Sequence, residues 1–266
     1  MGQNPGITVA TWRAVNLASD SANSIHDDRT AAAMGFRGGF VGGVTLLGQA
    51  FDAWLAEASG ASRLPAHVDF TLDGPTYEGE TITIQADSGE ERWNFSITGE
   101  AGTRTSHGAI TRVTSGGVVA TVERDAIEIA QLVDLRPDVL TTTRTFTQDE
   151  VRDYRSRTAD TNSARQHVAE IAPTGMWTNP MTPVIAVLTP DILTMHRSSS
   201  IDIQSLPVVG TPYVFTRSIV SARMNRESGK GFVIVSCVVR TLDGDGIVAN
   251  IRHKSVARMR DLASSV

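Results

Sequence analysis

The sequence has a single cysteine, no long apolar run and a shortage of positive charge. Cys237 alone can form neither an intrachain disulfide nor a cysteine-built zinc site. No stretch reaches 18 apolar residues, so no transmembrane helix is predicted. The chain has 24 Lys and Arg and 29 Asp and Glu, so the net charge is −5, which argues against a nucleic-acid binder. The first residues lack the basic start and apolar core of a signal peptide, so we expect a soluble cytoplasmic protein.

The rest of the composition is that of a globular protein. Hydrophobic residues make up 41% and charged residues 20%, with 23 Gly and only 10 Pro, which excludes a disordered, collagen-like or coiled-coil chain. A length of 266 residues suits either two domains of about 130 residues or one large α/β domain. Composition alone therefore leaves the number of domains open.

The first half of the chain shows helical patterns followed by strand patterns. A short run of helix formers follows His26, with Asp27 or Asp28 as its N-cap, and leads into a glycine-dense loop over 35–43. Apolar residues then recur at threes and fours over 44–58, which predicts a largely buried amphipathic helix. Beyond it, alternating apolar residues predict strands at 68–72, 81–85, 93–97 and 108–113.

The second half repeats this order. The segment 146–157 is predicted to be a helix that opens with a capping box between Thr147 and Glu150. The apolar segment 183–188 takes the place of the long helix of the first half. Strands are predicted at 200–203, 213–219, 231–240 and 247–251.

Landmark residues of the two halves keep a nearly constant offset. Asn162 follows Asn23 by 139 residues, Pro207 follows Pro75 by 132, and Gly210 follows Gly79 by 131. A drift of a few residues is what loop insertions produce. We therefore predict an α+β fold of two tandem units, 1–120 and 144–266, joined by a connector over 121–143. One irregular α/β domain is the alternative.

The motif around His26 resembles the MaoC-like, or (R)-specific enoyl-CoA hydratase, branch of the hotdog-fold superfamily. The resemblance is carried by Asn23-Ser-Ile-His26-x-Asp28, Gly35-Phe-Arg-Gly-Gly-Phe-Val-x-Gly43 and Val68-Asp-Phe-x-x-x-x-Pro75-x-x-x-Gly79. The second half repeats parts of it in Asp160-Thr-Asn162 and Ser200-Ile-Asp-Ile-Gln-Ser-Leu-Pro207-x-x-Gly210. The resemblance covers most of the chain and implies a tandem double hotdog, in which two long helices are each wrapped by a curved antiparallel sheet.

The catalytic pair of that family is out of register in this chain. In the family, an aspartate five residues before the histidine pairs with it, and the two handle the water or proton that adds across an acyl-thioester double bond. Here Ser21 holds that position and Asp20 precedes it by one residue. In the second half Asp160 holds the aspartate position, but Arg165 stands where the histidine would be.

His26 is the candidate general acid or base, because an imidazole exchanges protons near neutral pH. The alternative is a loop histidine with a structural hydrogen bond. Asp20 would assist His26 if the loop carries a one-residue insertion, Ser21 would assist by holding a water, or His26 would act as the sole base. Gly42 and Gly43 lead into the long helix, where free N–H groups would polarise a thioester carbonyl and stabilise an enolate. The alternative for these glycines is tight helix–sheet packing.

The remaining candidates are predicted to bind substrate or to mark a lost site. Asn23 is expected to fix the loop through bonds to the backbone. Arg37 and Arg165 are candidates for an anionic group such as the phosphates of coenzyme A, with pairing to Asp27 or Asp28 as the alternative for Arg37. Asp160 and Asn162 would be remnants of a second, degenerate site.

The resemblance implies an enzyme that hydrates an enoyl thioester or dehydrates a 3-hydroxyacyl thioester, on coenzyme A or an acyl carrier protein. A thioesterase, or a cyclisation or isomerisation on the same scaffold, is the alternative, because such reactions need no Asp–His pair. A non-catalytic acyl-binding protein is the third interpretation. We expect no cofactor and, since the six histidines show no ligand spacing, no metal. We also expect no nucleic acid and no membrane as partner, and the family allows a homodimer of double hotdogs.

Overall fold

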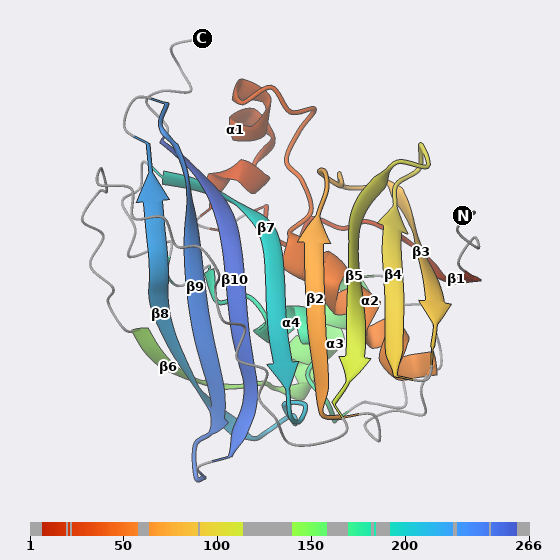
Figure 1. The fold of residues 1–266 in the computed structure, drawn as a ribbon, viewed down its shortest axis with the longest axis vertical. Coiled ribbons are helices and arrows are strands. Elements are labelled where there is room, and N and C mark those ends of the chain that lie inside the picture. Colours follow the sequence, from red (N-terminus) through yellow and green to blue (C-terminus); the bar gives the residue numbers. More distant parts are fainter. Residues whose placement is uncertain are drawn as a thin grey trace.

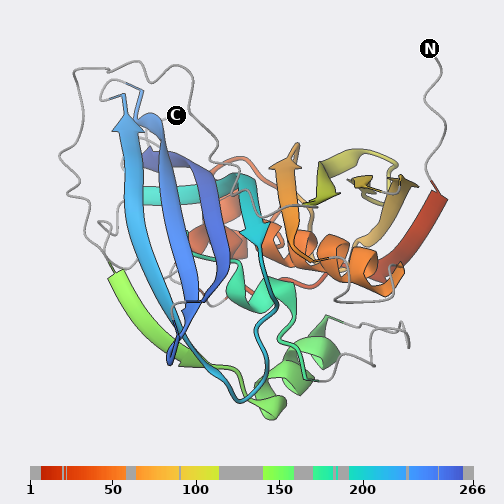
Figure 2. The same cartoon turned by 60° about the horizontal axis from the view of Figure 1, so that its bottom comes forward.

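The structure is a computed structural model that describes residues 7–19, 21, 23–57, 64–89, 91–113, 140–158, 170–181, 184, 192–225, 228–244 and 246–259. These residues form one ten-stranded sheet, in the order β1-β3-β4-β5-β2-β7-β10-β9-β8-β6, and each neighbouring pair is antiparallel. Helices α2, α3 and α4 lie behind this sheet in Figure 1 and on the same side of it in Figure 2. The sheet therefore joins both halves in a single layer.

The elements follow the chain in two similar series. The first contains β1 (Ile7–Arg13), the 3-10 helix η1 (Ser24–His26), α1 (Asp28–Ala33), α2 (Gly43–Glu57), β2 (Ala66–Leu72), β3 (Thr81–Ser88), β4 (Arg92–Thr98) and β5 (Arg104–Arg112). The second contains β6 (Leu140–Thr145), α3 (Gln148–Arg157), α4 (Thr174–Trp177), β7 (Ile192–Ile203), β8 (Pro212–Met224), β9 (Lys230–Thr241) and β10 (Ile247–Met259). Every strand and helix predicted within the described residues is confirmed, whereas β1 and β6 were not predicted.

The predicted central helix is α2, and it is buried nearly all round. Leu46, Leu47, Ala50, Phe51 and Trp54 are each at most 2% exposed and form one cluster with the inward side chains of the sheet. Complete burial of such side chains stabilises a fold by about 1.5–3 kcal/mol each. Burial on the sheet therefore holds α2 in place, and with it the position of its first residue.

The second half contributes a smaller helix beside α2. Gly48 of α2 and Gly175 of α4 meet so closely that a Cβ on Gly48 would lie 2.5 Å from the Gly175 nitrogen. The segment 183–188, predicted in place of a long helix, lies outside the described residues except for Val184, which packs in a second apolar cluster with Met181 and Val235. The part of the predicted connector before residue 140 lies outside them as well. No helix in the described ranges is long and apolar enough to cross a bilayer.

The two halves meet where β2 pairs with β7. At this seam His67 Nδ1 lies 2.6 Å from Asp202 Oδ1, and His67 Nε2 lies 3.3 Å from Asp69 Oδ1. Hydrogen bonding to Asp69, and then to Asp202, raises the pKa of His67 to about 9 against the opposing effect of burial. A protonated His67 therefore links carboxylates of both halves.

Raising the pH through about 9 is expected to weaken this seam. Because the folded-state pKa of His67 exceeds its ordinary value of 6.5, its contribution to stability is complete below 6.5 and is lost as the pH rises through 9. The Asp69 side chain is 62% exposed, so solvent screening limits the effect to on the order of 1 kcal/mol. Urea unfolding at about pH 6 and at about pH 10 measures the free energy of unfolding at each pH. Between these two values the wild type should lose more of this free energy than Asp202→Asn. An equal loss in both proteins would contradict this role.

Candidate functional site

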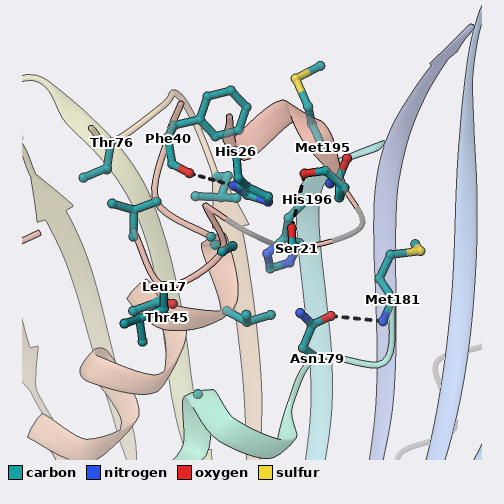
Figure 3. A pocket seen from close by; sticks show the side chains of 18 of the residues that line it. Leu17, Ser21, His26, Phe40, Thr45, Thr76, Asn179, Met181, Met195 and His196 are labelled. Atoms are coloured by element: carbon teal, nitrogen blue, oxygen red, sulfur yellow. Dashed lines mark hydrogen bonds between the residues drawn. The ribbon is translucent and has the colours of Figure 1, made fainter. Parts of the chain in front are cut away.

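A pocket of about 590 Å³ lies between the two halves (Figure 3). From the first half it is lined by the loop before η1, by η1 itself, by the glycine loop and by the first turn of α2. From the second half it is lined by α3, α4, β7 and β10. Any ligand that fills this pocket therefore contacts residues of both halves.

His26 lines this pocket from the end of η1. Its Nδ1 lies 2.7 Å from the carbonyl oxygen of Phe40 (Figure 3). A carbonyl oxygen only accepts, so Nδ1 carries the proton and Nε2 of the neutral ring holds a lone pair. Burial lowers the pKa of His26, and the bond to Phe40 offsets this only in part. The ring is therefore neutral at neutral pH, with Nε2 free to accept a proton.

The backbone of His26 is fixed from two sides. Asn16, which is 6% exposed, donates from Nδ2 to the carbonyl oxygen of His26 at 2.9 Å. On the other side Gly39 lies so close that a Cβ there would come within 2.1 Å of the same oxygen. The N–H of Gly39 is in turn bound by Asp28 Oδ1 at 2.8 Å. Glycine at position 39 thus lets the loop close over η1 and hold His26 toward the pocket.

Gly42 and Gly43 place the N-terminus of α2 beside His26. A Cβ on Gly42 would lie 3.9 Å from His26 Cε1, so the imidazole and the first turn of α2 face the same space. The first N–H groups of a helix lack partners within the helix and carry a positive partial charge. A carbonyl oxygen placed here would be polarised within reach of a neutral imidazole.

The other residues predicted around His26 form a network within the loop. Ser21 donates from Oγ to the carbonyl oxygen of Asn23 at 3.2 Å, and Asn23 donates from Nδ2 to the carbonyl oxygen of Thr194 on β7 at 2.7 Å. Ser21 and Asn23 both line the pocket. Asn23 therefore ties this loop to β7 of the other half. Asp20 lies outside the described residues.

Arg37 lies away from the pocket lining. Its guanidinium pairs with Glu80 and sits 4.1 Å above the ring of Tyr77, not beside Asp27 or Asp28. Asp27 instead caps α1 by accepting from the N–H of Thr30 at 3.0 Å. The remaining predicted site residues Asp160, Asn162 and Arg165 lie outside the described residues.

Sequence reasoning missed a buried polar chain on the second-half side of the pocket. His196 on β7 and His253 on β10 stack with ring centroids 3.9 Å apart, and both line the pocket. Ser199 Oγ lies 2.9 Å from His196 Nε2 and 3.3 Å from His253 Nδ1. Burial lowers the pKa of His253 to about 3, and burial together with His253 holds the pKa of His196 well below its usual range. Both rings are therefore neutral.

Three polar atoms of the pocket lining are buried without a hydrogen-bond partner in the described part of the chain. They are Asn23 Oδ1, Thr76 Oγ1 and His196 Nδ1. A buried polar atom without a partner costs about 1–3 kcal/mol, and a ligand that supplies the missing bond recovers part of that cost. No group of three or more His, Cys, Asp or Glu among the described residues is arranged to hold a metal.

The comparisons with known proteins identify the fold. No family model matches the sequence, and no curated protein matches it significantly. A Chloroflexus aurantiacus structure named as a MaoC domain protein dehydratase aligns with a TM-score of 0.62 at 11% identity, over 97% of this chain and 96% of that one. A conserved hypothetical protein from Mycobacterium tuberculosis, described as a double hotdog fold, aligns with a TM-score of 0.59 at 10% identity, over 96% and 97% of the two chains.

A third similar structure carries a different name. A Lactobacillus plantarum protein named as an oleoyl thioesterase aligns with a TM-score of 0.52 at 12% identity, over 96% of this chain and 97% of that one. At such identities the likeness is one of fold. The chain therefore has the predicted double hotdog fold, which it shares with structures named as MaoC domain and MaoC-like dehydratases.

Proposed function

We propose that the protein interconverts a 3-hydroxyacyl thioester and the corresponding enoyl thioester, on coenzyme A or an acyl carrier protein. The observation that carries this proposal is the free Nε2 of His26 beside the first turn of α2. Catalysis of this kind needs a proton acceptor near neutral pH and a donor to the thioester carbonyl. Both groups face one pocket, and neither requires a cofactor.

The dehydration would proceed with His26 as the only base. The N–H of Gly43 binds the thioester oxygen, and His26 Nε2 takes the proton from C2. The C2–H electron pair forms the double bond as the C3–O bond breaks, and the protonated His26 returns its proton to the departing hydroxide as water. Hydration is the reverse, and the imidazole ends each cycle neutral.

Thioester hydrolysis is the second candidate. Among the described residues no carboxylate bonds to His26, and a lone base with an oxyanion donor suffices to activate water against a carbonyl carbon. One of the similarly folded structures is also named as a thioesterase. This reaction would release free thiol, which hydration does not.

One assay separates the candidates. The purified protein is incubated with crotonyl-CoA, 3-hydroxybutyryl-CoA and butyryl-CoA, while double-bond absorbance and free thiol are followed separately. We expect crotonyl-CoA to lose its double bond without thiol release. Thiol release from all three would support the thioesterase, and no change in either signal would contradict both reactions on these acyl groups.

We expect the activity to fall at acidic pH only. Because burial lowers the pKa of His26 below 6.5, the neutral base is already fully formed at neutral pH. We expect kcat/KM to stay level from neutral to mildly alkaline pH and to fall as the pH drops through a value below 6.5. A profile that rises only above neutral pH would exclude His26 as the base.

A further inference from the structure

The surroundings of His196, Ser199 and His253 determine which atom donates and which accepts in each hydrogen bond of this polar chain. The Ser199 hydroxyl has one proton, so it can donate to one ring and must accept from the other. His196 Nδ1 lies at the start of α2, where a Cβ on Gly43 would be only 2.3 Å away. The positive partial charge of the first turn favours a lone pair on this nitrogen over an N–H.

This preference assigns the proton positions along the whole chain. With a lone pair on Nδ1, the neutral His196 carries its proton on Nε2 and donates to Ser199 Oγ. Ser199 then donates to His253 Nδ1. Of the atoms in this chain, His196 Nδ1 is the one that is buried without a hydrogen-bond partner in the described part of the protein, and with this assignment it is an acceptor that lacks a donor. A ligand that completes it must bring an O–H or N–H group into the pocket.

We propose that His196 Nδ1 accepts a hydrogen bond from the hydroxyl group that the reaction removes or adds, which makes His196 a substrate-positioning residue supplied by the second half. The inference rests on the proposed function, in which the C3 hydroxyl is the one donor that distinguishes a 3-hydroxyacyl group from a saturated or unsaturated one. His26 handles the proton on C2, and His196 orients the oxygen on C3. Because burial and the neighbouring His253 keep His196 neutral, its acceptor persists at neutral pH.

Binding measurements test this assignment apart from catalysis. In His26→Ala protein, which should convert the ligand about 10²–10⁴ times more slowly than the wild type, calorimetry compares the Kd of 3-hydroxybutyryl-CoA, in both configurations at C3, with that of butyryl-CoA. One hydrogen bond predicts that the better hydroxyl ligand binds roughly three- to tenfold tighter. Adding His196→Gln should abolish this difference, because glutamine reaches Ser199 but has no acceptor near the Nδ1 position. Adding His196→Asn should keep it, because the asparagine oxygen lies near that position.

The outcomes are distinct from those of the activity assay. No hydroxyl-dependent difference in the His26→Ala protein, or a difference that survives His196→Gln, would overturn the inference even if the wild type hydrates crotonyl-CoA. A difference that disappears in Gln and persists in Asn would support it even if the wild type converts nothing. If neither variant folds, Ser199→Ala should reduce the difference by releasing the ring, while Ser236→Ala, on β9 and outside the pocket, should not.

Discussion

Replacing His26 with alanine is expected to lower kcat by about 10²–10⁴, the usual contribution of a positioned acid–base group. The variant loses the free Nε2 that faces the first turn of α2 and that we propose as the proton acceptor. Folding should be little affected, because Asn16 and Gly39 hold the backbone of residue 26 and not its ring. Single-turnover rates on 3-hydroxybutyryl-CoA, together with far-UV circular dichroism, would measure both.

A matched control is available on the first half. His107 on β5 has a side chain that is 41% exposed and pairs with Asp73, and it does not line the pocket. His107→Ala should therefore keep kcat within a few-fold of the wild type. If His26→Ala retained full activity, the base would have to be sought elsewhere, whichever reaction the protein performs.

The second large effect is expected at Gly43. Alanine there would place its Cβ 2.3 Å from His196 Nδ1 and 2.4 Å from Leu72 Cδ1, far inside van der Waals contact. His196 cannot easily give way, since it stacks on His253 and is bonded to Ser199. Overpacking of this kind costs roughly 1–3 kcal/mol, and here it must also shift the first turn of α2 or the buried imidazole. We therefore expect Gly43→Ala to lower stability and to remove nearly all activity.

The neighbouring glycine supplies the comparison for stability. A Cβ on Gly42 meets no atom closer than 3.9 Å, which is ordinary van der Waals contact. Thermal unfolding of Gly42→Ala should thus resemble that of the wild type, whereas Gly43→Ala should unfold at a lower temperature. Equal unfolding temperatures for the two variants would show that the contact between Gly43 and His196 is more adaptable than its geometry indicates.

The strands that the sequence predicted are those with one face in the core. Along β4, for instance, Trp93, Phe95 and Ile97 are buried and the residues between them are more exposed. The sequence therefore shows the alternation of apolar and polar residues. The missed strands β1 and β6 are the two edges of the sheet. Neither buries any residue fully, as their burial patterns show, so their sequences carry no alternating apolar signal.

Sequence reasoning named candidate residues of the pocket only where they lie close together in the sequence. His26, Gly42 and Gly43 belong to one motif, whereas His196 and His253 meet only because β7 pairs with β10. Along a regular strand every second side chain faces the same side. In β7 this would place Arg197 on the inward face, with Ser199, Ile201 and Ile203. A register shift between Lys254 and Ser255 leaves Arg197 without a partner on β10, so that His196 and not Arg197 pairs with Ser255 and stacks on His253. A bulge of this kind leaves no signature in a single sequence.

Because β2 and β7 belong to one chain, the two halves that meet at this seam are encoded by different parts of one gene. A symmetric homodimer receives every substitution twice, once on each side of its axis. In this chain the two halves of one sheet are encoded separately, so a change on one side leaves the other untouched. One half can therefore carry an imidazole and a glycine turn while the other carries stacked histidines that line the same pocket. Covalent linkage of the two halves thus permits a pocket whose two sides differ, which a symmetric homodimer cannot form.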